Sequence, residues 1–80
     1  MSMPPTLTLD RLPCGARGRI IQLNSGGAMR RRLLDVGFVP GSGVEPLYCS
    51  AGRAMTAYLI GGAVIALRKA DARGIVVSRF

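Results

Sequence analysis

Glycine and proline interrupt this chain so often that only short elements fit between them. The 80 residues include 11 glycines and 5 prolines, which together make one fifth of the sequence. Proline breaks a helix because it removes a backbone donor, and glycine adds to the conformational entropy that a helix must overcome. Short elements joined by tight turns therefore fit the chain better than a helical bundle, and the fold is expected to be mainly β.

Short runs of apolar and β-branched residues predict the strands. They lie at residues 6–9, 19–23, 44–49, 55–60, 63–68 and 75–80. Gly61-Gly62 separates two of these runs and is a two-residue hairpin signal, because such turns need positive φ. Five to six antiparallel strands in one domain at residues 6–80 predict a small, strongly bent barrel, preceded by a flexible tail at residues 1–5.

One inserted α-helix is predicted at about residues 27–36. Met29, Leu33 and Val36 follow one another at i, i+4 and i+7, which places them on one face of a helix. We expect all three side chains to be buried against the strands.

The residues after this helix predict how it ends. Gly37 stands at the position where many helices place a residue with positive φ. Phe38 and Leu33 then occupy the two positions that make the hydrophobic contact of a Schellman ending. Pro40 and Gly41 follow directly, and the proline prevents the helix from resuming.

The sequence shows no recognisable catalytic constellation. It has no histidine, the commonest general base and metal ligand, and its four acidic residues are far apart. Neither GxxxxGKS nor GxGxxG occurs, so no phosphate-binding loop is predicted. Two cysteines fall short of the four Cys or His ligands of a closed zinc site. We therefore expect no enzyme activity, no cofactor and no tight metal site.

Cys14 and Cys49 are expected to be reduced. Two isolated cysteines without CxxC spacing do not make a disulfide framework, and disulfides are rare in the cytoplasm, so the pattern favours a reduced, cytoplasmic protein. Residues 1–9 lack the pattern of a signal peptide. The longest uncharged run, residues 54–67, is shorter than the roughly 20 apolar residues of a membrane-spanning helix.

Positive charge is the strongest functional signal. Eleven basic residues oppose four acidic ones, giving a net charge of +7 and an affinity for acidic partners. Arg30, Arg31 and Arg32 are expected to lie on the exposed sides of the helix. Asp35 is spaced to pair with Arg31 and Arg32, which leaves Arg30 the freest of the three. Arg30 and Arg31 are therefore our candidate contacts to a protein partner.

Binding to nucleic acid is the alternative function, since small barrels also bind RNA. Such binding needs aromatic side chains beside the basic patch, but the chain has four aromatic residues, no tryptophan and no RNP-like or GXXG signature. We expect no specific nucleic-acid partner. Tyr48 and Tyr58 are instead taken as a second candidate surface for a protein partner.

Three segments of the sequence resemble the FeoA family, whose members are small cytoplasmic proteins that accompany the bacterial ferrous-iron transporter FeoB. They are LDRLPCGARGRI (residues 9–20), RRRLLDVGFVPGSGV (30–44) and VIALRKADARGIVV (64–77). The resemblance implies an SH3-like barrel with an inserted helix. It also implies a role in iron uptake through contact with the cytoplasmic GTP-binding part of the transporter. On this interpretation the chain meets the membrane only through the transporter, and a weak homo-oligomer is allowed.

Overall fold

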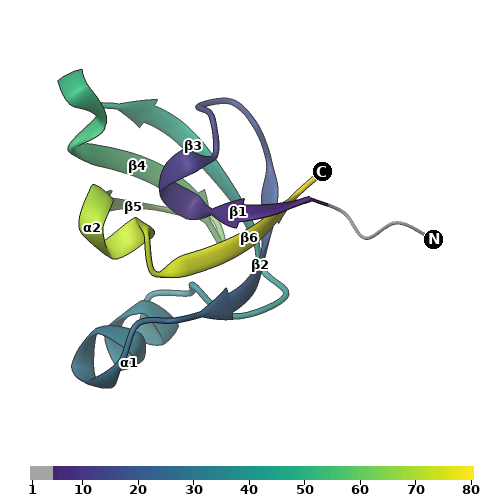
Figure 1. Ribbon diagram of the computed structural model, residues 1–80, viewed down its shortest axis with the longest axis vertical. Coiled ribbons are helices and arrows are strands. Elements are labelled where there is room, and N and C mark those ends of the chain that lie inside the picture. Colours follow the sequence, from purple (N-terminus) through teal and green to yellow (C-terminus); the bar gives the residue numbers. More distant parts are fainter. Residues whose placement is uncertain (1–4) are drawn as a thin grey trace.

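The computed structural model describes residues 5–80 and contains six strands and two α-helices (Figure 1). The strands are β1 (Thr6–Thr8), β2 (Gly18–Leu23), β3 (Gly43–Cys49), β4 (Met55–Ile60), β5 (Ala63–Arg68) and β6 (Ile75–Arg79). The helices are α1 (Gly27–Asp35) and α2 (Lys69–Ala72), and two 3-10 turns are η1 (Leu9–Arg11) and η2 (Ala51–Arg53). The prediction of five to six strands and one inserted helix is confirmed.

The predicted tail at residues 1–5 lies outside the described residues except for Pro5. The Pro5 carbonyl accepts a hydrogen bond from the Arg79 amide at 3.4 Å. Pro5 is therefore attached to β6 and extends the pairing of β1.

All six strands form one antiparallel sheet in the order β1-β6-β2-β3-β4-β5. The register shifts between Ile20 and Gln22 in β2 and between Pro46 and Tyr48 in β3. Such bulges bend a strand and increase its twist, which lets a short sheet curl around one core. The helix α1 lies below the curled sheet in Figure 1, between β2 and β3 in the chain.

The core is built from the inward side of the curled sheet and the turns that close it. In β4 the buried side chains alternate with exposed ones, as a strand with one core-facing side requires. Phe38 and Tyr58 meet edge to face, with ring centroids 6.3 Å apart and planes at 85°. The buried hydrophobic residues are Leu9, Leu12, Ile20, Leu23, Leu33, Phe38, Val44, Tyr58, Ile60, Leu67, Ala72, Ile75 and Val77.

The Schellman ending of α1 is confirmed. The Phe38 amide donates to the Leu33 carbonyl at 2.9 Å, and the Gly37 amide donates to the Leu34 carbonyl at 3.1 Å. Gly37 has φ +111°, and Leu33 and Phe38 are both buried. These two hydrogen bonds satisfy carbonyls that a helix end leaves free, and they direct the chain from α1 into the core.

The expectation that Met29, Leu33 and Val36 are all buried is only partly right. Leu33 is buried and Met29 is half-buried, but Val36 is 40% exposed. The helix ends at Asp35, and Val36 is its C-cap with φ −90° and ψ 0°. Helical spacing no longer applies there, so Val36 leaves the face that it would share with Leu33.

Gly37→Val is expected to destabilise the domain by about 1–3 kcal/mol, the usual range for a residue held in a sparsely populated backbone region. A Cβ at Gly37 would meet only the Ile60 Cγ1 atom, at an ordinary 3.9 Å, so the cost comes from the backbone. Thermal melting should show a Tm lower by about 10 °C. Gly37→Asn is the control, because asparagine tolerates positive φ better. Equal melting of valine and asparagine variants would contradict this account.

Candidate functional site

The three arginines of α1 are exposed, but they are not equally free. The Arg30 guanidinium donates from Nη1 to the Leu23 carbonyl at 3.2 Å. The expectation that Arg30 is the freest of the three is therefore wrong, because this side chain ties α1 to the end of β2. To contact a partner, the Arg30 guanidinium would have to give up its hydrogen bond to the Leu23 carbonyl.

The expected pairing of Asp35 with Arg31 and Arg32 is also absent from the described residues. Within residues 5–80 the ion pairs are Arg17 with Glu45 (Nε to Oε1, 3.5 Å) and Arg73 with Asp10 (Nε to Oδ2, 3.9 Å). An exposed pair along a helix gains only about 0.2–0.5 kcal/mol, which holds two mobile side chains together weakly. Arg31 and Arg32 instead line a shallow cleft of about 500 Å³ with Gly27, Ala28 and Asp35.

The two tyrosines assigned to a second surface lie on opposite sides of the sheet. Tyr48 is 66% exposed, whereas Tyr58 is 1% exposed and belongs to the core. The assignment of Tyr58 to a docking surface is therefore wrong, since β4 alternates and places Tyr58 on its inward side with Thr56. Burial raises the pKa of the Tyr58 phenol above its ordinary value of 10.0, while its hydrogen bond to Thr56 lowers it.

Tyr48 belongs to an outward sheet face that is largely apolar. The register places it opposite Ala57, which in turn lies opposite Ala66. The neighbouring cross-strand pair is Leu59 with Val64, and both side chains are exposed. This apolar face is a second candidate surface for a protein partner, besides the arginines of α1.

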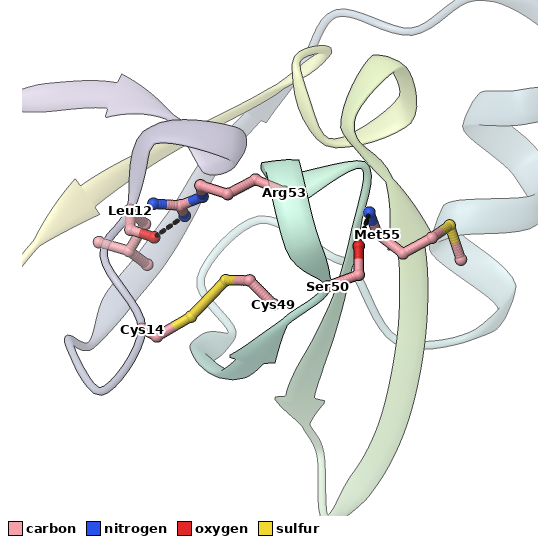
Figure 2. The surroundings of a disulfide bond; sticks show 6 residues. All are labelled: Leu12, Cys14, Cys49, Ser50, Arg53 and Met55. Carbon is pink, nitrogen blue, oxygen red and sulfur yellow. Dashed lines mark hydrogen bonds between the residues drawn. A yellow bond between two sulfur atoms is a disulfide. The ribbon is translucent and has the colours of Figure 1, made fainter.

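The structure joins Cys14 and Cys49 in a disulfide, which overturns the expectation of reduced thiols (Figure 2). The turn after η1 folds back onto β3, where the Gly15 amide donates to the Pro46 carbonyl at 2.9 Å. That contact brings together two cysteines that are 35 residues apart in the chain. Their spacing carried no signal of pairing, because the tertiary fold alone makes them neighbours.

A second basic surface was not predicted from the sequence. A cleft of about 680 Å³ lies between β1 and the segments η1, η2 and α2. Its basic residues come from three separate elements, so they form no run in the sequence. The lining residues are Thr6, Leu7, Thr8, Asp10, Arg11, Arg53, Lys69 and Arg73.

The described residues contain no group of three or more His, Cys, Asp or Glu side chains placed to hold a metal ion. No helix in residues 5–80 has the length and apolar character needed to cross a membrane. The candidate binding surfaces described above therefore consist of arginine, lysine and exposed apolar side chains.

A family model described as the FeoA domain matches residues 7–79. The chain belongs to the FeoA family. The family is associated with ferrous iron transport, and its members are accessory SH3-like domains. No curated protein matches this FeoA-family chain.

Solved structures of FeoA proteins share the fold. Iron(II) transport protein A from Clostridium thermocellum is 33% identical, with a TM-score of 0.87, over 91% of this chain and 45% of that one. FeoA from Chlorobium tepidum is 27% identical, with a TM-score of 0.87, over 92% and 70% of the two chains. Stenotrophomonas maltophilia FeoA complexed with zinc, described as a procaryotic SH3 domain protein, is 28% identical, with a TM-score of 0.81, over 90% and 89%. The expected SH3-like barrel and family are confirmed.

Proposed function

We propose that this chain is a cytoplasmic accessory protein of ferrous-iron uptake that binds the GTP-binding part of the FeoB transporter. Family membership connects the chain with iron transport. The observation that carries the contact is the exposed arginine surface of α1, where Arg31 and Arg32 have no ion pair within the described residues. The described residues present side chains suited to binding another protein.

Arginine suits this task because its planar guanidinium makes two parallel hydrogen bonds to a carboxylate. Arg31 and Arg32 stand on a helix whose end is fixed by the Schellman hydrogen bonds, so their Cα positions are held by the core. Charged groups at the rim of an interface mainly speed association and make it salt-dependent. The transporter surface that meets α1 is accordingly expected to be acidic.

Charge reversal at Arg31 and Arg32 tests this contact. The Arg31→Glu, Arg32→Glu double variant should associate with the soluble cytoplasmic domain of the transporter about tenfold more slowly at low salt, and the difference should shrink at high salt. Binding kinetics on a sensor surface at two salt concentrations measure both effects. Melting curves establish that the variant is folded.

The matched control is Arg19→Glu, Arg79→Glu, which makes the same change of charge on β2 and β6. Both residues are exposed, and Arg79 is the last residue of β6, whose C-terminal end lies away from α1 in Figure 1. Its association rate should fall much less than that of the α1 variant. Equal rates for the two double variants would remove α1 as the contact and leave the apolar face around Tyr48 as the next candidate.

A further inference from the structure

The strand β1 is an edge strand, and the basic cleft runs along its open side. Within residues 5–80 it pairs with β6 alone. Three consecutive residues of β1, Thr6, Leu7 and Thr8, all line the cleft. Successive side chains of a strand point to opposite faces, so a cleft that touches all three follows the backbone edge.

The register shows which backbone groups of β1 face this cleft. The Arg79 amide donates to the Pro5 carbonyl, so these two residues form a hydrogen-bonded pair. Such pairs alternate along antiparallel strands, which makes Leu7 the next residue bonded to β6. The N–H and C=O groups of Thr6 and the N–H of Thr8 therefore point away from β6, toward the cleft. The Thr8 carbonyl is occupied, because Thr8 is the N-cap of η1 and its carbonyl accepts the first hydrogen bond of that turn.

The rest of the cleft is strongly positive. Asp10 is its one carboxylate, and that side chain is 7% exposed, accepts a hydrogen bond from the Thr8 hydroxyl and lies 3.9 Å from the Arg73 Nε. The buried carboxylate is thus already occupied. Four cations line the cleft, an excess of three positive charges over Asp10: Arg11, Arg53, Lys69 and Arg73.

Arg53 is held at this cleft by an unusual backbone. Its φ is +60°, the one positive value at a non-glycine residue in the described part of the chain. Its guanidinium donates to the Leu12 carbonyl at 3.2 Å, beside the Cys14–Cys49 disulfide (Figure 2). Residues in sparsely populated conformations are retained where the surrounding structure fixes them, and they gather at binding sites.

We propose that the cleft binds an extended, carboxylate-rich peptide segment, which adds to β1 as a further strand. Main-chain hydrogen bonds to Thr6 and to the Thr8 amide would supply affinity. Arg11 and Lys69 would select acidic side chains, because within residues 5–80 they have neither an ion pair nor a side-chain hydrogen bond, unlike Arg53 and Arg73. The cations also repel basic strands, which is how many proteins protect an edge from unwanted pairing. No aromatic side chain lines the cleft for stacking bases, so a peptide fits better than nucleic acid. This site is separate from the α1 contact and does not depend on it.

A ten-residue peptide of alternating Glu and Val, blocked at both ends, is the probe. Its titration into the ¹⁵N-labelled full chain should saturate, weaken with salt, and shift and protect the amides of Thr6 and Thr8. The Leu7 amide, already bonded to β6, should change little. A Lys and Val peptide and inorganic pyrophosphate are the comparison ligands, and neither should give this alternating pattern.

Two pairs of variants separate the contributions of charge and backbone. Arg11→Gln, Lys69→Gln should weaken peptide binding about tenfold, equivalent to about 1.4 kcal/mol, whereas the matched Arg31→Gln, Arg32→Gln variant should bind as wild type. Thr8→Pro removes the outward amide at a residue whose φ of −80° and ψ of 149° suit proline, and it should abolish binding. Thr8→Val keeps the amide and should still bind.

Several results would overturn the proposal. The first is that the Glu and Val peptide shows no saturable binding at low salt. The second is that the Lys and Val peptide binds equally well. The third is that a folded Thr8→Pro variant still binds the Glu and Val peptide. Pyrophosphate shifts that reproduce the peptide pattern would reduce the cleft to an anion site and also overturn strand addition. If Thr8→Pro does not fold, the alternation of amide protection and the two charge variants decide the question.

Discussion

Reduction of the Cys14–Cys49 disulfide is expected to lower the Tm by about 15–30 °C. The bond links residues 35 positions apart, and opening a loop of that length returns about 3.8 kcal/mol of conformational entropy to the unfolded chain. Each kcal/mol moves the Tm of a domain of this size by about 4–8 °C. Circular dichroism melting with and without a thiol reductant measures the shift.

The Cys14→Ala, Cys49→Ala variant provides the control for this experiment. It should melt near the reduced wild type, and the reductant should not change its Tm. Thiol titration of the oxidised wild type should find no free cysteine, since both are paired. Identical melting of oxidised and reduced wild type would show that the disulfide contributes nothing to stability.

Phe38→Ala is expected to destabilise the domain by about 3–5 kcal/mol, the usual cost of removing a buried aromatic side chain. Phe38 is 0% exposed and packs edge to face on Tyr58. It also occupies the position that closes the end of α1, so its loss weakens the helix and the core together. Urea unfolding gives the change in free energy from the shift of the transition midpoint at constant slope.

Phe80→Ala is the matched control, because it removes the same side chain from the surface. Phe80 is 65% exposed and contacts the Arg19 guanidinium, which lies 5.5 Å from the ring centroid. An exposed cation–π contact contributes about 0.5–1 kcal/mol, so this variant should lose no more than that. A Phe38→Ala variant as stable as Phe80→Ala would mean that Phe38 is not a core residue.

The sequence predicted well those features that short segments determine by themselves. The Gly61-Gly62 turn, the strand runs and the end of α1 each depend on neighbouring residues, and the structure confirms them. Gly37 and Phe38 show the reason most clearly. A glycine at the helix end and an apolar residue after it fix the hydrogen bonds within six residues, without help from the rest of the fold.

The sequence was a poorer guide wherever distant segments meet. Cys14 and Cys49 become neighbours only because the turn after η1 contacts β3. Tyr58 was assigned to a surface because residues 55–60 include few polar side chains. An alternation of polar and apolar residues therefore does not show which side of β4 faces the core. Among the predicted site residues, Arg30 and Arg31 are exposed on α1 as expected, but the hydrogen bond from Arg30 to Leu23 could not be read from the helix alone.

The position of β6 sets the order in which this domain can be completed during synthesis. It lies between β1 and β2, although it is the last strand of the six, and its Ser78 pairs with Thr6 about 70 residues away. Contacts so distant in the chain form slowly, because the entropy of closing a long loop opposes them. Until β6 is available, β1 has no partner strand and β2 pairs with β3 alone. Chaperones that shield open strand edges should therefore matter most for this domain in the interval before β6 pairs with β1 and β2.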